Sequence, residues 1–321
     1  MKRLLLILMG LAALAAVFAY WQLWASSGPA DGPHNLIVEE GSSLGSVAGQ
    51  LESQAMIPGT AQTYKAMARI FGSNDPVQAG EFEIPAGASG SEILDLLQRG
   101  QPVQRLVTIP EGTPSILVYE KLMQQKLLTG SIPVPEEGSV LPNSYSFKRG
   151  EGRAAVLKRM QDAMTKELDG LWAKRQPHSV VTSKEEAIIL ASVVEKETGK
   201  ASERPMVAGV YSNRVRIGMK LDADPTVIYP ITKGKPLGRR ILRSELNADN
   251  GYNTYARAGL PIGPIANPGK ESIGAVLNPA RTQALYFVAD GTGGHVFANT
   301  LAEHNANVRK WYALRRARGE M

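Results

Sequence analysis

Residues 182–199 read TSKEEAIILASVVEKETG, and this stretch predicts the helix around which a domain must fold. A hydroxyl side chain at its start can accept a hydrogen bond from a free backbone N–H, while a glutamate three residues on reaches back, as in a capping box. Glycine at position 199 is common just beyond the end of a helix. Seven of the eight residues from 187 to 194 are apolar. A helix that is apolar around most of its circumference belongs inside a domain.

Two carboxylates, Glu195 and Glu197, stand at the end of this predicted helix. Burial in apolar surroundings raises the pKa of a carboxyl group, and a second carboxylate nearby raises it further. A raised pKa is what a general acid needs near neutral pH. At about 100° per residue, Glu195 falls at the rim of the apolar arc, whereas Glu197 lies nearer Leu190 and Val193. Two interpretations remain open: one glutamate is a catalytic acid, or both end a core helix and pair with nearby cations.

The sequence on both sides of Glu195 carries a family resemblance. ASVVEKET at 191–198 is followed by VAGVYSNR at 207–214, and further on by DPTVIY at 224–229, YNTY at 252–255, GPIANPG at 263–269 and GGHVF at 293–297. This set resembles the YceG-like family of endolytic murein transglycosylases, across the whole chain and most specifically over 185–310. Asp222 and Ile262 depart from the residues that are commoner in the family; both could alter the lining of a cleft, and neither touches Glu195.

The resemblance implies that Glu195 is the catalytic acid/base of a lytic transglycosylase. Such an enzyme cleaves the β-1,4 bond between N-acetylmuramic acid and N-acetylglucosamine inside a nascent glycan strand, and so limits strand length. Ordinary glycosidases need two carboxyl groups, but here the C6 hydroxyl of the muramoyl sugar is the nucleophile and closes a 1,6-anhydro ring. The resemblance implies no cofactor. It also implies substrate-binding roles for a set of polar and aromatic residues: Asp224, Thr226, Tyr252, Asn253, Thr254, Tyr255 and Glu197.

Nearer the N-terminus, one pattern recurs three times, at 36–51, 82–97 and 106–122. Each copy is a short alternating strand, a glycine turn, a Ser or Thr able to cap, and apolar residues at helical spacing. The copies are unequally spaced, which predicts small strand–turn–helix modules in a mixed α/β region rather than a solenoid. The first copy resembles the opening of a LysM peptidoglycan-binding module, although an ordinary strand–glycine–helix turn would look the same.

The remaining body of the chain divides by composition. Residues 127–150 are rich in turn formers, and 153–171 read as an amphipathic helix with Val156, Met160, Met164 and Leu168 on one stripe. We therefore expect an α+β protein with a LysM-like α/β region at 35–126, a connector and helix at 127–180, and a mixed α/β catalytic domain at 181–321.

The first residues predict a transmembrane helix. After a short cytoplasmic tip, residues 1–3, the run 4–24 is uncharged and almost wholly apolar, and about 20 such residues cross a bilayer. Lys2 and Arg3 should stay in the cytoplasm, which sends the body outward through a linker at 25–34. The sequence therefore predicts a single-pass protein of the inner membrane with its catalytic part in the periplasm. The alternative is a cleaved signal peptide ending at 17–19.

Composition excludes several classes of protein. The chain has 321 residues, no cysteine and a net charge of +6, so disulfide scaffolds and Cys-based metal sites are excluded. The positive charge suits an acidic wall polymer or an anionic membrane surface, and is too dispersed to indicate nucleic acid. The four histidines are scattered, so no metal is expected. No G-x-S-x-G elbow between a strand and a helix argues for an esterase or peptidase, and no G-x-x-x-x-G-K-[ST] motif is present.

The expected partners are glycan strands of peptidoglycan, the inner membrane and, by the resemblance, wall synthases of the penicillin-binding class. A rival hypothesis from another class remains: a non-catalytic, membrane-tethered protein that binds or organises peptidoglycan through its LysM-like units. The two hypotheses differ in one observable, since only the enzyme releases 1,6-anhydro ends.

Overall fold

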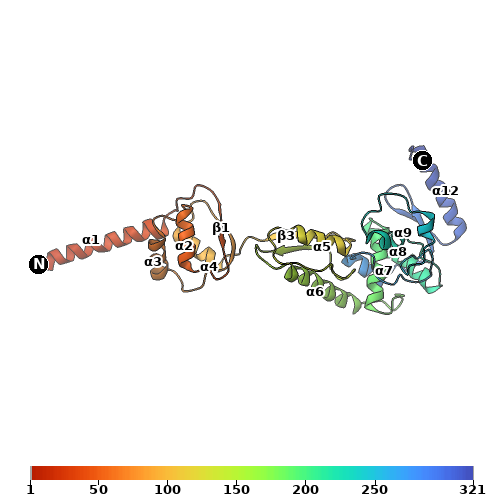
Figure 1. Ribbon diagram of the computed structural model, residues 1–321, viewed down its shortest axis with the longest axis horizontal. Coiled ribbons are helices and arrows are strands. Elements are labelled where there is room, and N and C mark those ends of the chain that lie inside the picture. Colours follow the sequence, from red (N-terminus) through yellow and green to blue (C-terminus); the bar gives the residue numbers. More distant parts are fainter. Residues whose placement is uncertain (1, 321) are drawn as a thin grey trace. The chain divides into compact units, whose positions relative to one another are not determined.

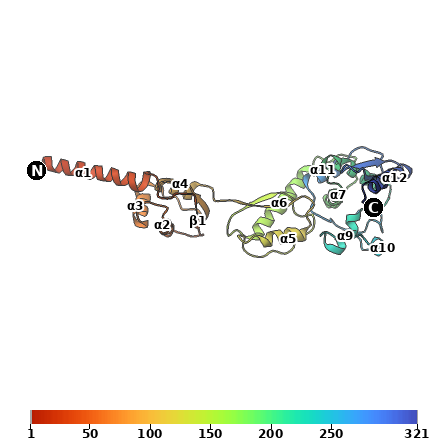
Figure 2. The ribbon, with the colours of Figure 1, turned by 90° about the horizontal axis from the view of Figure 1, so that it is seen from above.

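The structure, a computed structural model, describes residues 2–320. The chain forms two compact units (Figures 1 and 2). The first contains the residues up to Arg105 together with Ser146–Glu151, and the second contains Leu106–Tyr145 and the chain from Gly152 onward. Helices and strands occur in both units, which confirms the α+β class.

The chain begins with one long apolar helix, α1 (Lys2–Tyr20), which continues as a π-helical turn, η1 (Trp21–Ala25). Together they make 24 residues, and the 18-residue stretch of highest hydropathy, with a mean of 2.4, has no residue buried inside the protein. At 1.5 Å per residue this length exceeds the about 30 Å of a bilayer's hydrocarbon core. Trp24, near the end of this apolar run, is only 3% exposed and packs on Tyr64 with ring centroids 5.6 Å apart. The end of the apolar helix is therefore built into the core of the first unit.

The first two strand–turn–helix copies make up most of the first unit. β1 (His34–Val38) pairs antiparallel with β2 (Gly80–Ile84), with His34 opposite Ile84. The three helices beside this ribbon are α2 (Leu44–Ser53), α3 (Ala61–Phe71) and α4 (Gly90–Arg99). Each begins where a hydroxyl side chain caps it, from Ser43, Thr60 and Ser89. Apolar faces of all five elements form one buried cluster, so the alternating strands and spaced helical residues serve a single small core.

The third copy belongs to the second unit. β3 (Arg105–Thr108) pairs with β4 (Ser144–Phe147), and the division between the units runs through these strands. α5 (Ser115–Gln124) follows β3, and α6 (Arg153–Trp172) follows β4. The expected stripe of α6 is confirmed, because Val156, Met160 and Met164 are buried and Leu168 is partly buried.

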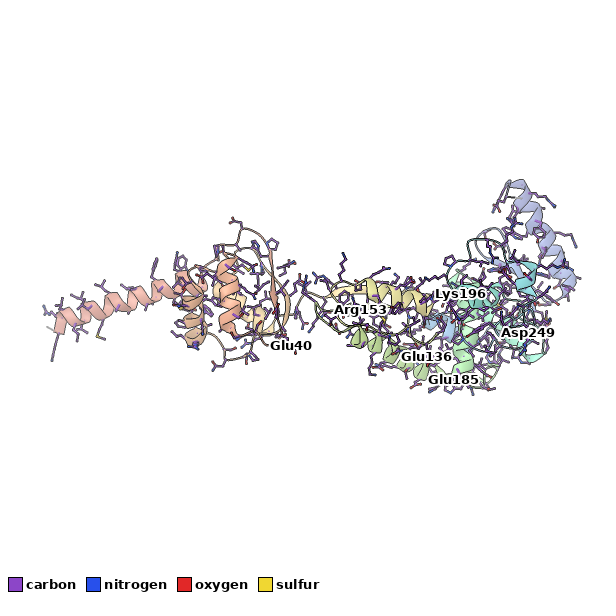
Figure 3. The ribbon with its side chains drawn as sticks, in the orientation of Figure 1. Glu40, Glu136, Arg153, Glu185, Lys196 and Asp249 are labelled. Atoms are coloured by element: carbon purple, nitrogen blue, oxygen red, sulfur yellow. The ribbon has the colours of Figure 1, made fainter. Side chains whose placement is uncertain are left out.

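Arg153, labelled in Figure 3, fastens the start of α6. Its guanidinium donates to the carbonyls of Leu122, Gly130 and Gln125, at 2.9, 2.6 and 2.8 Å. Several carbonyls at the end of α5 and in the turn after it are thereby satisfied by one side chain. The start of the turn-rich segment 127–150 is thereby fixed beside α5 and α6 within the second unit.

The core of the second unit is helical. It is formed by α7 (Lys184–Glu197), the 3₁₀ turn η2 (Ala201–Glu203), α8 (Arg204–Arg216), α9 (Asp224–Thr232), α10 (Arg243–Leu246) and α11 (Lys270–Leu277). A hairpin of β5 (Tyr286–Ala289) and β6 (His295–Ala298) and a final helix, α12 (Leu301–Ala317), follow. α11 packs against both α7 and α8.

The buried helix expected from residues 182–199 is confirmed. Within α7, residues 187, 188 and 190–194 are buried, so α7 lies at the centre of the unit's apolar cluster. Ser183 accepts a hydrogen bond from the backbone N–H of Glu186, at 3.2 Å. The Glu186 carboxylate in turn accepts from the backbone N–H of Thr182, at 2.7 Å. This is the capping chemistry that the sequence indicates.

A buried asparagine ties three distant segments together. Asn267 is 0% exposed; its side-chain oxygen accepts from Val140 N at 2.9 Å, and its amide donates to Thr113 O at 2.9 Å and Ser115 Oγ at 3.1 Å. Its backbone carbonyl accepts from Gly112 N at 3.0 Å. The loop before α11 is thereby joined to the start of α5 and to the segment leading into β4.

We expect Asn267→Ala to destabilise the second unit by about 3 kcal/mol, because it leaves buried backbone groups without partners, each costing about 1–3 kcal/mol. Calorimetric unfolding of the full chain in detergent measures the loss. Asn305→Ala is the matched control; Asn305 is exposed on α12, so this change should shift stability by less than about 0.5 kcal/mol. Equal stability of the two variants would contradict the tying role of Asn267.

Candidate active site

Glu195 lies in the last turn of α7, where the helix leaves the apolar core. Its side chain is only 5% exposed. One carboxylate oxygen, Oε1, accepts from Arg204 Nη2 at 3.0 Å, and the other, Oε2, accepts from the backbone N–H of Gly269 at 2.9 Å. Gly269 is the N-cap of α11, so the helix dipole adds partial positive charge at the same place. The carboxylate is therefore held by two donors that favour a negative charge.

The same guanidinium nitrogen serves a second glutamate. Arg204 Nη2 donates to Glu111 Oε2 at 2.7 Å, and the Glu111 side chain is 41% exposed. Glu111 comes from the loop between β3 and α5, more than eighty residues before Arg204. Sequence reasoning gave Glu111 no role; its only signal there was its position in the Pro-Glu-Gly turn of the third strand–turn–helix copy.

The turn after Glu111 passes directly over Glu195. Gly112 has φ +70°, and a Cβ at this position would lie 3.3 Å from Glu195 Cγ. A glycine is needed here for two reasons, its left-handed backbone and this close approach. The β3–α5 loop thus covers the carboxylate that α7 presents.

A hollow of about 410 Å³ lies beside this cluster. Glu111, Gly112 and Lys196 border it on the side of Glu195, and Tyr229, Lys235 and Ile265 are among the residues that line the rest. Lys196 and Glu185 mark opposite ends of α7 in Figure 3. The hollow therefore adjoins the carboxyl-terminal end of α7, where Glu195 is held.

Glu197, two residues further on, lies in different surroundings. Its carboxylate is buried, with Tyr211, Asp224 and Arg214 nearby, and its Oε1 atom has no hydrogen-bond partner. Burial first, and the negative charge of Asp224 second, raise the pKa of Glu197 to about 7. The two glutamates thus diverge: Glu195 is ion-paired beside the hollow, and Glu197 is packed against α8 and α9.

Some of the expected substrate-binding residues gather near Glu197. The Tyr255 hydroxyl donates to Asp224 Oδ1 at 2.6 Å, and Asp224 is exposed while Tyr255 is half-buried. Tyr252 is half-buried and packs against Tyr229, with ring centroids 4.9 Å apart. Because Tyr229 lines the hollow, Tyr252 lies directly behind its wall.

The other three expected residues are enclosed by protein. Thr226, Asn253 and Thr254 are 0%, 2% and 2% exposed. The hydroxyls of Thr226 and Thr254 are 2.9 Å apart and hydrogen-bonded to each other. The Asn253 amide donates to three backbone carbonyls, those of Glu245, Leu246 and Ala248. These polar groups fix the course of the 245–255 segment, and none of them is free to meet a ligand.

Across residues 2–320, no group of three or more His, Cys, Asp or Glu side chains is placed so that it could hold a metal ion. The His295 Nδ1 atom lies 2.8 Å from Glu203 Oε2, and Lys200 approaches Glu203 at 3.3 Å. The chemistry available at the end of α7 is therefore that of carboxylates, an arginine and backbone N–H groups.

The raised pKa of Glu197 makes a stability prediction. Between pH 4.5 and about 7, Glu197 holds a proton in the folded chain but releases it in the unfolded chain. The Glu197 carboxylate therefore lowers the free energy of unfolding: this loss is absent below pH 4.5 and complete above about pH 7. The gain in free energy of unfolding of Glu197→Gln over the wild type should therefore be larger at pH 8 than at pH 5, by up to about 3 kcal/mol. Denaturant titrations at both pH values measure the difference.

The control for this prediction is Glu185→Gln, which removes a carboxylate from the exposed first turn of the same helix, where hydrogen bonds from its own backbone N–H and from Ser183 lower the pKa of Glu185. It should show no gain at pH 8. An equal effect of Glu197→Gln at pH 5 and pH 8 would count against a protonated, buried Glu197.

The chain matches the YceG-like family over residues 36–310. It is 35% identical over 182 residues to the endolytic murein transglycosylase of Bacillus subtilis, an alignment that covers 56% of this chain and 49% of that protein. It is 28% identical over 281 residues to the endolytic murein transglycosylase of Streptococcus pneumoniae D39, covering 72% and 50% respectively. The chain thus spans about half the length of the curated relatives it matches.

A solved structure gives the same result for the fold. A crystal structure of a yceG-like protein from Listeria monocytogenes aligns with a TM-score of 0.52 at 25% identity, covering 86% of this chain and 98% of that one. The matched region 36–310 includes all three residues of the ion-paired site: Glu195, Arg204 and Gly269. The family match covers well over half of the chain, and the protein therefore belongs to the YceG-like family.

Proposed function

We propose that the protein is an endolytic lytic transglycosylase of peptidoglycan, with Glu195 as its acid/base. The observation that carries the proposal is the placement of Glu195: a carboxylate at the end of a buried helix, held by Gly269 N–H and Arg204, beside a hollow. The names of the curated relatives support the substrate class. General acid–base catalysis requires a group of this kind within reach of the scissile bond.

The reaction balances with a single carboxyl group. Glu195 gives its proton to the oxygen that leaves with C4 of N-acetylglucosamine, as the bond from that oxygen to C1 of N-acetylmuramic acid breaks. The Glu195 carboxylate then accepts the proton of the C6 hydroxyl of N-acetylmuramic acid, while the C6 oxygen bonds to C1 of the same sugar. One C–O bond breaks, one forms, no water is consumed, and the proton returns to Glu195. Because the nucleophile is part of the substrate, proximity supplies much of the rate.

The surroundings of Glu197 fit a one-carboxylate reaction. A second catalytic carboxylate would have to face the sugar, as in ordinary glycosidases, and Glu197 is instead buried against Tyr211. Its contribution is to set the packing of α8 and α9 against α7. We assign it a packing role beside Tyr211 rather than a role in bond breaking.

Substrate contact falls to the groups that remain accessible. Asp224, Tyr255 and Tyr252 offer a carboxylate and aromatic faces of the kind that bind sugar rings and N-acetyl groups. The enclosed Thr226, Asn253 and Thr254 act on the substrate only through the shape of the segment that they hold.

We further propose that the first unit is LysM-like and holds glycan, and that the chain is a single-pass protein of the inner membrane. Two strand–turn–helix copies with capped helices support the first point. Lys2 and Arg3 at the start of a 24-residue helix that is otherwise uncharged support the second, since positive flanks stay in the cytoplasm. The catalytic part then faces the periplasm, where wall synthases of the penicillin-binding class act.

Glu195→Gln should lower the release of 1,6-anhydro muropeptides from purified glycan strands at least about 100-fold, because Gln offers neither a transferable proton nor a base. Mass spectrometry of the products measures the release, and thermal unfolding checks the fold. Glu197→Gln is the matched variant, two residues away, and should keep forming anhydro ends. Full activity of Glu195→Gln would refute its role, and a wild type without anhydro products would favour a binding or scaffold protein.

The membrane-bound protein should carry an uncleaved N-terminus. Intact-mass analysis of protein extracted from membranes after alkaline carbonate washing should therefore include residues 1–24, since the apolar run is longer than a signal-peptide core of about 7–15 residues. A mature chain that begins at Tyr20 would show that the helix is a signal sequence instead.

A further inference from the structure

We propose that Glu111 is a positioning residue for Glu195, acting through the guanidinium that the two carboxylates share. The inference rests on the function proposed above and extends it to a residue from a different part of the chain. Its basis is a set of contacts around one nitrogen, Arg204 Nη2, which is 2.7 Å from Glu111 and 3.0 Å from Glu195.

Glu111 is held in place although it is partly exposed. A Cβ on Gly269 would overlap the Glu111 carboxylate, so the side chain lies directly against the backbone whose N–H binds Glu195. The next residue, Gly112, donates its backbone N–H to Asn267 O at 3.0 Å. The loop is thus fixed at both Gly269 and Asn267, and the Glu111 carboxylate remains beside Arg204.

The charges explain why this position matters. Arg204 and the N-terminus of α11 both place positive charge beside Glu195. Glu111 opposes them in two ways: it shares the positive charge of Arg204, and it adds a negative charge beside Glu195. Both effects reduce the net positive charge that surrounds the Glu195 carboxyl group. Glu111 therefore sets both the position of Arg204 and the charge that Arg204 presents to Glu195.

Other charged groups around the end of α7 are already engaged or face elsewhere. Lys270, next to Gly269 on α11, pairs with Glu167 at 3.2 Å. Glu203 of η2 pairs with His295 and Lys200. Asp224 of α9 bonds to Tyr255 on the side of Glu197.

Lys196, on α7 itself, is exposed and borders the hollow. It lies near Gly112, so it adds a solvent-screened positive charge to that of Arg204. Within residues 2–320, Glu111 is the carboxylate that shares the Nη2 atom of Arg204 with Glu195.

The test compares the pH dependence of anhydro-muropeptide release in wild type, Glu111→Gln, Glu111→Asp and Glu120→Gln. Glu120 is the matched control, because it is similarly exposed (38%) and ion-paired, with Lys235 at 2.6 Å, but does not touch Arg204. In Glu111→Gln, the alkaline limb of the rate profile should move to lower pH by about one unit, with a rate about tenfold lower on that limb. Glu111→Asp keeps the carboxylate and should return the profile most of the way to that of the wild type. Glu120→Gln should have the wild-type profile.

The outcomes separate this inference from the proposed function. A wild type that forms no anhydro ends would remove the function itself. An active wild type with an unchanged profile in Glu111→Gln would overturn only the role of Glu111. A lower rate in Glu111→Gln without movement of the alkaline limb, accompanied by a lower thermal unfolding midpoint, would also overturn it, since that is the pattern of a purely structural residue.

Discussion

The ion-paired carboxylate at the end of α7 is the interaction on which the functional part of the structure depends. α7 is buried over most of its length, and burial of a charge is costly unless donors compensate it. Glu195 receives those donors from α8, through Arg204, and from the N-terminus of α11, through Gly269. The helices that build the core therefore also determine where the carboxylate is held and which donors it meets.

The loops that surround this carboxylate depend in turn on the hydrogen-bond network of Asn267. Its amide and carbonyl groups meet Gly112, Thr113, Ser115 and Val140, so the turn that carries Glu111 cannot move independently of the loop before α11. Buried polar networks of this kind are stabilising only when every member is satisfied. The network explains how residues near 110 join a site whose acid lies near 195.

Two glutamates separated by one lysine illustrate how environment assigns roles. Glu195 meets a guanidinium and a helix N-terminus, whereas Glu197 meets Tyr211 and the charge of Asp224. Burial raises the pKa of Glu197 to about 7, a value that would suit a general acid. Its enclosure nevertheless keeps it from a substrate. A perturbed pKa is therefore informative about function only together with access to a cleft.

The sequence by itself determined the apolar N-terminal helix, the buried α7 with its capping, the stripe of α6 and the strand–turn–helix copies, because periodicity and caps are local properties of the chain. Family resemblance singled out Glu195, which periodicity alone did not distinguish from Glu197. Only the tertiary structure decided that the third copy joins the second unit and brings Glu111 to Arg204. Only it enclosed Thr226, Asn253 and Thr254. These outcomes depend on contacts between residues tens to more than a hundred positions apart, and no local pattern encodes such contacts.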